Sequence, residues 1–203
     1  MGLYQKFFAH GLALGDDAQH RIYGERKRRL FADLEGTVVE IGPGTGINLP
    51  YLPDDLHWIG LEPNPHMHGY LREQLEGRSF DAELRTDPAE DTGLPDACAD
   101  VVISTLVLCS VPDLTETMAE LRRILKPGGR LLFIEHVAAP HDTWLYTLQR
   151  GIRPVWKRLG DGCHPDRDTG AALQQAGFSS VSFERFDTGL PVLSPHIIGT
   201  ATK

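Results

Sequence analysis

The stretch Glu40-Ile41-Gly42-Pro43-Gly44-Thr45-Gly46 decides the fold of this 203-residue chain. It overlaps the end of Thr37–Ile41 (TVVEI), a short β-branched run that predicts a buried strand. Glycines at alternate positions allow a tight turn and let a ligand approach main-chain N–H groups. We expect a helix to start directly after the turn, so the stretch predicts a strand–turn–helix unit of an α/β protein.

The same alternation of strands and helices extends along the rest of the chain. The expected strands are 37–41, 56–61, 80–85, 100–104, 130–136, 181–186 and 196–202, and the expected helices are 21–34, 65–76, 114–125, 143–159 and 169–176, with a turn at 126–129 (KPGG). This order predicts a mostly parallel sheet covered on both faces, with one antiparallel strand at its end. The length predicts one domain, with a helical cap over 1–35, a cofactor-binding half over 36–137, and a lid helix with the substrate side over 138–203.

An acidic residue follows the second expected strand, which ends in Leu61-Glu62-Pro63. The carboxyl ends of neighbouring parallel strands meet at one edge of a sheet, so Glu62 is expected close to the glycine turn. A carboxylate in this position accepts hydrogen bonds from the hydroxyls of a ribose. The two features together predict a nucleoside-containing cofactor.

The charge beside the glycine turn separates two classes of cofactor. The dinucleotide pattern is G-x-G-x-x-G, whereas here the third glycine comes one residue earlier and Ile47 stands in its place. Glu40 would repel a pyrophosphate and would favour a cationic ammonium group, such as that of S-adenosylmethionine. These features disfavour an NAD-dependent dehydrogenase. The remaining alternative is that the glycine turn has a purely structural role and binds no ligand.

With these motifs the chain resembles the class I S-adenosylmethionine-dependent methyltransferases. The resemblance covers 37–136 and rests on the E-x-G-x-G-x-G turn, the acid after the second strand, DVVIS at 100–104 and LKPGG at 125–129. It implies a Rossmann-like three-layer sandwich with a seven-stranded sheet in the order 3-2-1-4-5-7-6 and an antiparallel last strand. It also implies S-adenosyl-L-methionine as the cofactor and S-adenosyl-L-homocysteine as the product.

The resemblance implies a set of cofactor-contacting residues. Glu40 would hold the amino group directly or through water, Glu62 would bind the ribose, and Met67 would pack near the adenine. The remaining candidates are Gly42, Gly44, Gly46, Asn48, Pro63, Ala89, Glu90, Asp91, Thr105 and Leu106. Many relatives carry G-D-A-E before the fourth strand, but this chain has Pro88 where that aspartate would be. We therefore expect the adenine contact at Glu90 or Asp91, with the backbone N–H of Ala89 or Glu90 reading the ring.

The second half is similar to a narrower group, the methyltransferase-like 7 family of thiol S-methyltransferases. The matching segments are TLVLCSV (105–111), EHVAAP (135–140), Trp144, Gln149, PVW (154–156), DGC (161–163), RDT (167–169) and PHI (195–197). This resemblance implies methyl transfer to a small thiol. Animal members of the family carry an apolar N-terminal membrane anchor, and the first residues here do not read as one.

Three residues at the expected acceptor side are candidates for catalysis: His136, Asp161 and Cys163. A free thiol has a pKa near 8.5 and is already partly thiolate at pH 7, so a modest base suffices. Each candidate also has a purely structural interpretation. His136 would cap a strand, Asp161 would build a turn, and Cys163 would be a small packing residue. The aromatic residues of the expected helix 143–159 either line an acceptor pocket or belong to the core. His196 is expected to be a core residue whose ring nitrogens are hydrogen-bonded.

Composition excludes several other functions. The net charge of -8 argues against a nucleic-acid binder that relies on bulk charge. Three cysteines and nine histidines without ligand spacing predict neither a disulfide framework nor a metal site. No apolar run is long enough for a membrane span and no signal peptide is recognisable, so we expect a cytoplasmic protein. The charged segment 25–29 is expected to be a solvated helix face.

The sequence thus predicts an S-adenosylmethionine-dependent methyltransferase with a small-molecule acceptor, foremost a thiol. A phospholipid amine head group and a quinone-like ring are the alternative acceptors. Leu3, Phe7, Phe8 and Leu12 keep membrane contact open, since they form an apolar stripe if the segment is helical. A non-catalytic binding module with the same fold is the alternative from another class, and the oligomeric state is left open.

Overall fold

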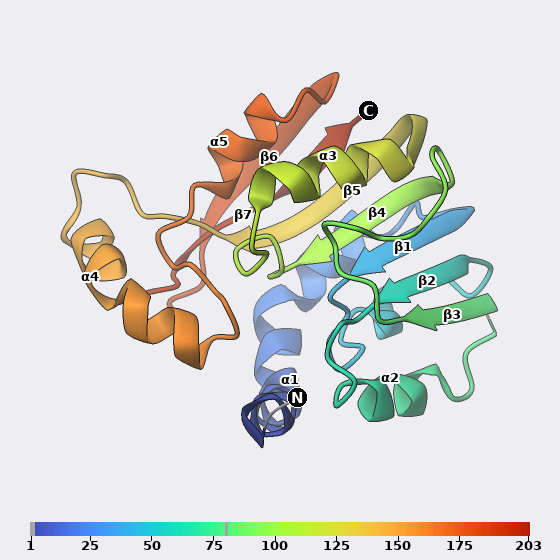
Figure 1. Ribbon diagram of the computed structural model, residues 1–203, viewed down its shortest axis with the longest axis horizontal. Coiled ribbons are helices and arrows are strands. Elements are labelled where there is room, and N and C mark those ends of the chain that lie inside the picture. The colour runs from blue at the N-terminus through green and yellow to red at the C-terminus, as the bar shows by residue number, and fades with distance from the viewer. Residues whose placement is uncertain (1–2, 80) are drawn as a thin grey trace.

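A seven-stranded sheet with the order β3-β2-β1-β4-β5-β7-β6 forms the centre of the computed structural model, which describes residues 3–79 and 81–203 (Figure 1). The strands are β1 Thr37–Ile41, β2 His57–Leu61, β3 Asp81–Arg85, β4 Ala99–Thr105, β5 Leu125–His136, β6 Ser180–Asp187 and β7 Pro195–Thr202. The first five strands are mutually parallel where they pair, and β7 is antiparallel to both β5 and β6. The predicted strand order and the antiparallel end are confirmed.

Helices cover both faces of this sheet, as the alternation predicted. The helices are α1 Leu3–Leu30, the short 3-10 helix η1 Leu49–Tyr51, α2 His68–Leu75, α3 Leu114–Ile124, α4 Trp144–Leu159 and α5 Thr169–Gln175. One apolar cluster joins the sheet to Met118 and Leu121 of α3 and Leu173 of α5, and a second joins it to Phe31 and to Leu71 of α2. Because β1 and β2 lie between these layers, four of their five residues are buried in each.

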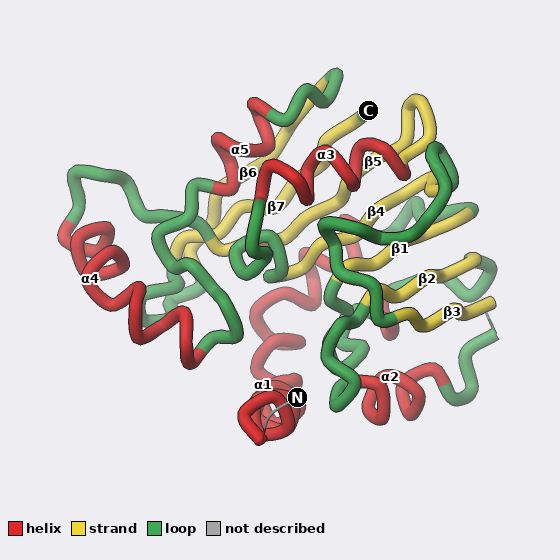
Figure 2. Tube along the Cα trace, in the orientation of Figure 1, coloured by secondary structure: helices red, strands yellow, loops and turns green. Residues whose placement is uncertain are grey.

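Helix α4 lies apart from both helix layers. Figure 2 shows α4 and its flanking loops beside the carboxyl ends of the central strands, away from the sheet faces. Thr143 caps the helix by accepting a hydrogen bond from the N–H of Tyr146. The buried Gln149 ties α4 down, because its side chain accepts from Ala139 N and donates to the carbonyl oxygen of Val192. The helix predicted over 143–159 is therefore present and fixed to the loops after β5 and β6, and its role as a lid stays a prediction.

Three predicted element boundaries were wrong. The glycine turn is followed by η1 and not by an α-helix, because Leu52 precedes Pro53 and is forced into an extended conformation with ψ 141°. Helix α1 begins at Leu3 and not near 21, since no proline interrupts the chain before Pro43. Strand β5 begins at Leu125, and the expected turn 126–129 is a bulge within it, where the register shifts relative to β4. Phe80, the expected start of the third strand, lies outside the described residues.

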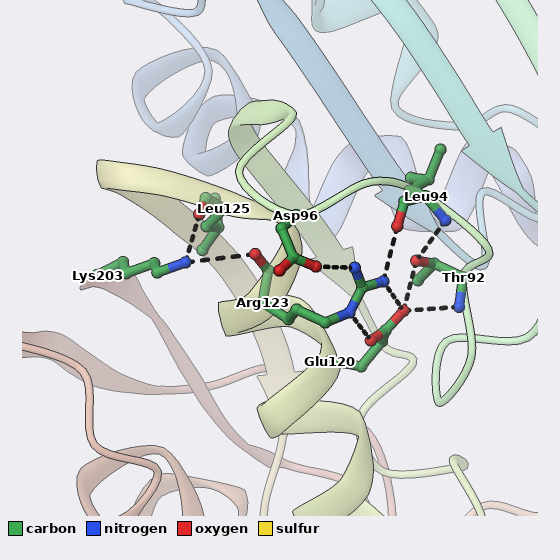
Figure 3. A network of polar contacts seen from close by, with 7 residues as sticks. All are labelled: Thr92, Leu94, Asp96, Glu120, Arg123, Leu125 and Lys203. Atoms are coloured by element: carbon green, nitrogen blue, oxygen red, sulfur yellow. Dashed lines mark hydrogen bonds and ion pairs between the residues drawn. The ribbon is translucent and has the colours of Figure 1, made fainter.

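A polar network closes the loop before β4 against helix α3 (Figure 3). Arg123 donates to both carboxylate oxygens of Glu120, to Asp96 and to the carbonyl oxygen of Leu94. Glu120 also accepts from the backbone N–H and the hydroxyl of Thr92, which is buried. These donors lower the pKa of Glu120 to about 2, with the Arg123 contact as the largest cause.

Replacing Glu120 with glutamine is expected to destabilise the protein by about 2 kcal/mol at pH 7, since charge-assisted hydrogen bonds are lost. A carboxylate with a lowered pKa contributes stability above its unfolded pKa and loses it as the pH falls through the folded value. The wild-type advantage should therefore shrink as the pH is lowered from about 4.5 toward 2. Urea unfolding at several pH values measures this, with the exposed Glu116→Gln on the same helix as the control. An unchanged difference between variant and wild type at low pH would contradict this account.

Among the described helices, none has the combination of length and apolarity that a membrane crossing requires. On the predicted N-terminal stripe, Phe7 is exposed, whereas Phe8 and Leu12 are half-buried. The first member of the stripe, Leu3, lies in α1, and its side chain is outside the described part of the structure. The stripe therefore belongs to the long helix α1 and not to a separate surface helix.

Candidate active site

The carboxyl ends of the adjacent strands β2, β1, β4 and β5 lie at one edge of the sheet (Figure 1), and each strand has a polar residue at or near this end. Glu40 lies near the end of β1, Glu62 follows β2, Thr105 ends β4 and His136 ends β5. In open α/β sheets this edge is where ligands bind. Four residues that are distant in sequence are thus brought to one candidate site.

Glu40 is almost fully buried and holds an amide side chain in place. One carboxylate oxygen accepts from Asn48 Nδ2 at 2.8 Å, and the other accepts from Trp58 Nε1 at 3.0 Å. Asn48 Nδ2 also donates to Thr105 Oγ1 at 3.0 Å. Burial is the largest influence on Glu40 and raises the pKa of its carboxyl group. Asn48 is therefore fixed with its nitrogen toward Glu40.

The oxygen of that amide has no partner. Asn48 Oδ1 is buried and accepts no hydrogen bond within the described residues. A buried acceptor without a donor costs about 1–3 kcal/mol. The ammonium group of a methionine moiety would supply the missing donor beside the Glu40 carboxylate.

Lys27 is a member of this site that the sequence analysis missed. Its side chain is fully buried, and its ammonium group lies 5.6 Å from the ring centroid of Tyr51 without a hydrogen-bond partner in the described parts of the chain. Burial lowers the pKa of Lys27 to about 8, against the opposing attraction of Glu40 and Asp16. The expectation that 25–29 is a solvated face is therefore wrong at Lys27. Its helical spacing from the buried Tyr23 and Phe31 was the available signal.

The glycine turn and Glu62 are joined as predicted. Gly42, Gly44 and Gly46 have φ values of +54°, +60° and +89°, which favour glycine. Gly44 donates its N–H to one oxygen of Glu62 at 2.9 Å, and Asn64 donates its N–H to the other at 2.9 Å. A Cβ added at Gly44 would meet nothing within 4 Å, so the outer side of the turn is open. A carboxylate with spare lone pairs beside an open turn fits a ribose of the expected cofactor.

The other residues expected to contact the cofactor, including those around the adenine, differ in burial. Met67 and Ala89 are buried, whereas Pro63 and Asp91 are exposed. Glu90 is half-buried, and its Oε1 is buried with no hydrogen-bond partner among the residues described. Leu106 is half-buried with a φ of +60° and donates its N–H to the carbonyl oxygen of Ile134. Of the two acids expected on this side, Glu90 is the one with an unused buried oxygen.

A second cluster lies at the ends of β4 and β5. The donor atoms of Cys109, His136 and Cys163 all lie within 4.8 Å of one another, and all three residues are buried. His136 Nε2 lies 3.0 Å from Cys163 Sγ. The contact with Cys109, followed by that with His136, lowers the pKa of the Cys163 thiol, whereas the pKa of Cys109 is raised by its contact with Cys163 and by burial. The structure thus brings together two of the three predicted catalytic residues with Cys109, which the sequence places on the acceptor side after the fourth strand.

Asp161, the third predicted catalytic residue, stands outside this cluster. It has a φ of +47°, is exposed, and donates its backbone N–H to Tyr4 Oη at 3.0 Å. The following residue, Gly162, also has a positive φ of +86°. The turn geometry of this pair agrees with the structural interpretation of Asp161.

The aromatic residues of α4 do not form a common pocket. Trp144 is 76% exposed, and Tyr146 stacks on His141 at 4.3 Å between ring centroids. Trp156 is half-buried, and its indole nitrogen lies near Gly160 in the loop that carries Cys163. The core interpretation of Trp144 was wrong, since its side chain is largely exposed, and its pocket role stays a prediction.

His196 is the satisfied core residue that the sequence suggested. Its Nδ1 lies 3.1 Å from the carbonyl oxygen of Ser194 and therefore carries the proton, so Nε2 accepts from Tyr23 Oη at 2.8 Å. Burial is the largest cause that lowers its pKa, to about 4. With both nitrogens paired, His196 has no spare group for catalysis.

Comparison with known proteins agrees with this geometry. A family described as a methyltransferase domain matches residues 39–133. The chain is 37% identical over 214 residues to the human thiol S-methyltransferase TMT1B, covering 99% of this chain and 88% of that protein. It is 35% identical to human TMT1A, covering 90% of this chain and 82% of that protein. A phosphatidylethanolamine N-methyltransferase of Cereibacter sphaeroides is 29% identical over 51% of this chain and 52% of its own length.

Solved structures share the fold at lower identity. A SAM-dependent methyltransferase from Aquifex aeolicus superposes with a TM-score of 0.67 and 18% identity, covering 94% of this chain and 95% of that chain. The [4+2]-cyclase SpnF superposes with a TM-score of 0.70 and 18% identity, covering 88% of this chain and 80% of that chain. Sheet order, glycine turn and near full-length similarity agree, and the chain therefore belongs to the class I S-adenosylmethionine-dependent methyltransferases.

Proposed function

We propose that this enzyme transfers a methyl group from S-adenosylmethionine to a small thiol. The observation that supports the acceptor is the 37% identity to a thiol S-methyltransferase over 99% of the chain. That span includes α4, the loop with Cys163 and the β6–β7 pair, and not only the cofactor half. Enzymes that share a fold differ in their acceptors through the segments that form the acceptor side of the site, so similarity in these segments is informative about the acceptor.

The cofactor is held, in this proposal, by the edge of β1 and β2. Asn48 Oδ1 and the Glu40 carboxylate receive the ammonium group, Glu62 receives the ribose hydroxyls, and the open side of Gly44 allows close approach. When bound, the cofactor supplies an electrophilic methyl group on a sulfonium. The buried Met67 and Ala89, with the unpaired oxygen of Glu90, form the adenine side.

The acceptor sulfur is placed beside the buried cluster at the ends of β4 and β5. Methyl transfer from a sulfonium is an in-line displacement, for which the protein supplies alignment and exclusion of water. Loop 160–168 closes this region, because His164 N donates to the carbonyl oxygen of Cys109 and Arg167 donates to those of Leu108 and Val111. We assign the acceptor side to His136 and Cys163 and not to Asp161, which lies outside the buried cluster. The cytoplasmic location expected from the sequence stays a prediction.

Radiolabelled S-adenosylmethionine tests the acceptor directly. The enzyme is incubated with a simple alkyl thiol such as 2-mercaptoethanol, with phosphatidylethanolamine vesicles, and with a quinone-like ring compound. We expect label in the methyl thioether, at a rate at least tenfold above that of the other two acceptors. Label in lipid or in the ring compound without label in the thiol would reverse the assignment. Absence of S-adenosylhomocysteine binding in calorimetry would favour the non-catalytic module instead.

A further inference from the structure

Three atoms that bind thiophilic metals converge where the acceptor is expected. Cys109 follows β4, His136 ends β5 and Cys163 lies in the loop after α4, so each comes from a different segment. Their exposed fractions are 2%, 2% and 7%, and their donor atoms all lie within 4.8 Å of one another. Two thiols and one imidazole form a set that suits Zn²⁺.

The spacing of these atoms suits one ion. Tetrahedral zinc, with Zn–S near 2.3 Å and Zn–N near 2.0–2.1 Å, separates its ligand atoms by about 3.6–3.8 Å. The 3.0 Å between His136 Nε2 and Cys163 Sγ is below this range, and the 4.8 Å limit of the cluster is above it. Side-chain shifts of about 1 Å would bring the three atoms to zinc distances. We propose that Cys109, His136 and Cys163 bind a zinc ion that keeps its fourth position for the acceptor thiol.

The imidazole at this position is incompletely satisfied. Its contact with Cys163 Sγ is its one hydrogen bond among the described residues, and His136 Nδ1 is buried with no partner there. In His196, by contrast, both ring nitrogens are paired. Nε2 is the nitrogen that would bind the ion, so Nδ1 is a separate buried polar atom at the acceptor side, which a bound water or acceptor group would satisfy.

The backbone around the two cysteines is held independently of their side chains. Cys163 N donates to the carbonyl oxygen of Gly160, and His164 N donates to that of Cys109 at 2.9 Å. A side chain at Gly162 would lie 2.9 Å from the carbonyl oxygen of Ser110, so the two loops approach closely there. Two thiolates neutralise a divalent cation, which removes the cost of burying either charge alone. The site is therefore preorganised for one ion with three protein ligands, the arrangement of catalytic zinc.

This inference rests on the proposed function, because the open position is given to a thiol. The acceptor R–SH would bind the zinc as R–S⁻ and release its proton to solvent. A lone pair of the bound sulfur then forms the new S–CH₃ bond while the bond from the methyl carbon to the sulfonium sulfur breaks. The products are the neutral methyl thioether and S-adenosylhomocysteine. A thioether is a weaker zinc ligand than a thiolate, so the product leaves.

Zinc content measured on the purified full-length protein tests the site. After incubation with zinc chloride and desalting, we expect one zinc per wild-type chain and at least a tenfold weaker affinity in Cys109→Ser and in Cys163→Ser. Cys98→Ser is the matched control, because Cys98 is half-buried and precedes β4 whereas Cys109 follows it. Binding of S-adenosylhomocysteine by each variant shows that it is folded. Cobalt in place of zinc should give a thiolate-to-cobalt absorption band that both cluster variants lose and the control keeps.

Chelator treatment separates this inference from the proposed function. The stripped enzyme should bind S-adenosylhomocysteine normally, lose at least tenfold in thiol methylation, and regain it with zinc chloride. Failure of the wild type to take up zinc, equal loss in the Cys98→Ser control, or full thiol methylation by the stripped enzyme would each overturn the inference while leaving the thiol acceptor in place. Zinc bound through Cys109 and Cys163 in an enzyme that labels only lipid would overturn the thiol acceptor and the open-position role together.

Discussion

Replacing Glu62 with alanine is expected to weaken binding of S-adenosylhomocysteine by about 100- to 1,000-fold. The carboxylate accepts from the N–H groups of Gly44 and Asn64, so its removal leaves both donors unpaired and loosens the glycine turn. It also removes the proposed acceptors for the ribose hydroxyls. Two charge-assisted hydrogen bonds correspond to about 3–4 kcal/mol, which gives the stated range.

Isothermal titration calorimetry of the variant measures this loss. Glu83→Ala is the control, since Glu83 is exposed on the neighbouring strand β3 and contacts neither the turn nor Asn64 in the described structure. Thermal unfolding of both variants shows whether the fold survives. An affinity within fivefold of wild type for a folded Glu62→Ala protein would refute the assignment of Glu62 to the cofactor.

Titration of Lys27 is expected to raise the free energy of unfolding by about 3 kcal/mol as the pH increases from 8 to 10.5. Burial lowers the pKa of the folded-state ammonium group from 10.5 to about 8. Between these values the unfolded chain binds more protons at this position than the folded chain, so the free energy of unfolding rises with pH. Below pH 8 the folded protein carries the buried charge opposite Glu40.

The pH dependence of chemical denaturation in Lys27→Met tests this expectation. The difference in unfolding free energy between wild type and variant should shift in favour of wild type across this window, because the variant lacks the titrating group. Other groups that titrate in alkali, such as Tyr23, are common to both proteins and cancel. Lys6→Met, an exposed lysine on the same helix, should show no such shift. Parallel curves for wild type and Lys27→Met would show that Lys27 is not desolvated in solution.

Local sequence patterns were sufficient for the glycine turn and for the carboxylate that pairs with it. The run TVVEI and the three glycines specify a strand and a turn with positive φ, and these features depend on neighbouring residues alone. Adjacent parallel strands end at the same edge, so the proximity of Glu62 and Gly44 followed from the strand order. The error after the turn was also local in origin, since Pro53 restricts Leu52 and stops the helix.

The residues of the acceptor side could not be predicted from their spacing in the sequence. Asp161 and Cys163 are two residues apart, yet only Cys163 points into the buried cluster. Asp161 and Gly162 both have positive φ values, which turn the chain before Cys163. This turn decides that the side chain of Cys163, and not that of Asp161, faces inward. Metal-ligand spacing rules apply to short loops and helices, and they could not detect donors contributed by three separate segments.

The sequence by itself determined a mostly parallel sheet and the position of the carboxylates beside the glycine turn, because short-range periodicity and the alternation of strands and helices specify them. The strand order came from the family resemblance that the motifs carry. Only the tertiary structure decided that the charge of the buried Lys27 interacts with that of Glu40 and that Cys109, His136 and Cys163 meet. The rotation of α1 about its axis and the path of loop 160–168 set those contacts, and both depend on packing against residues far away in the chain.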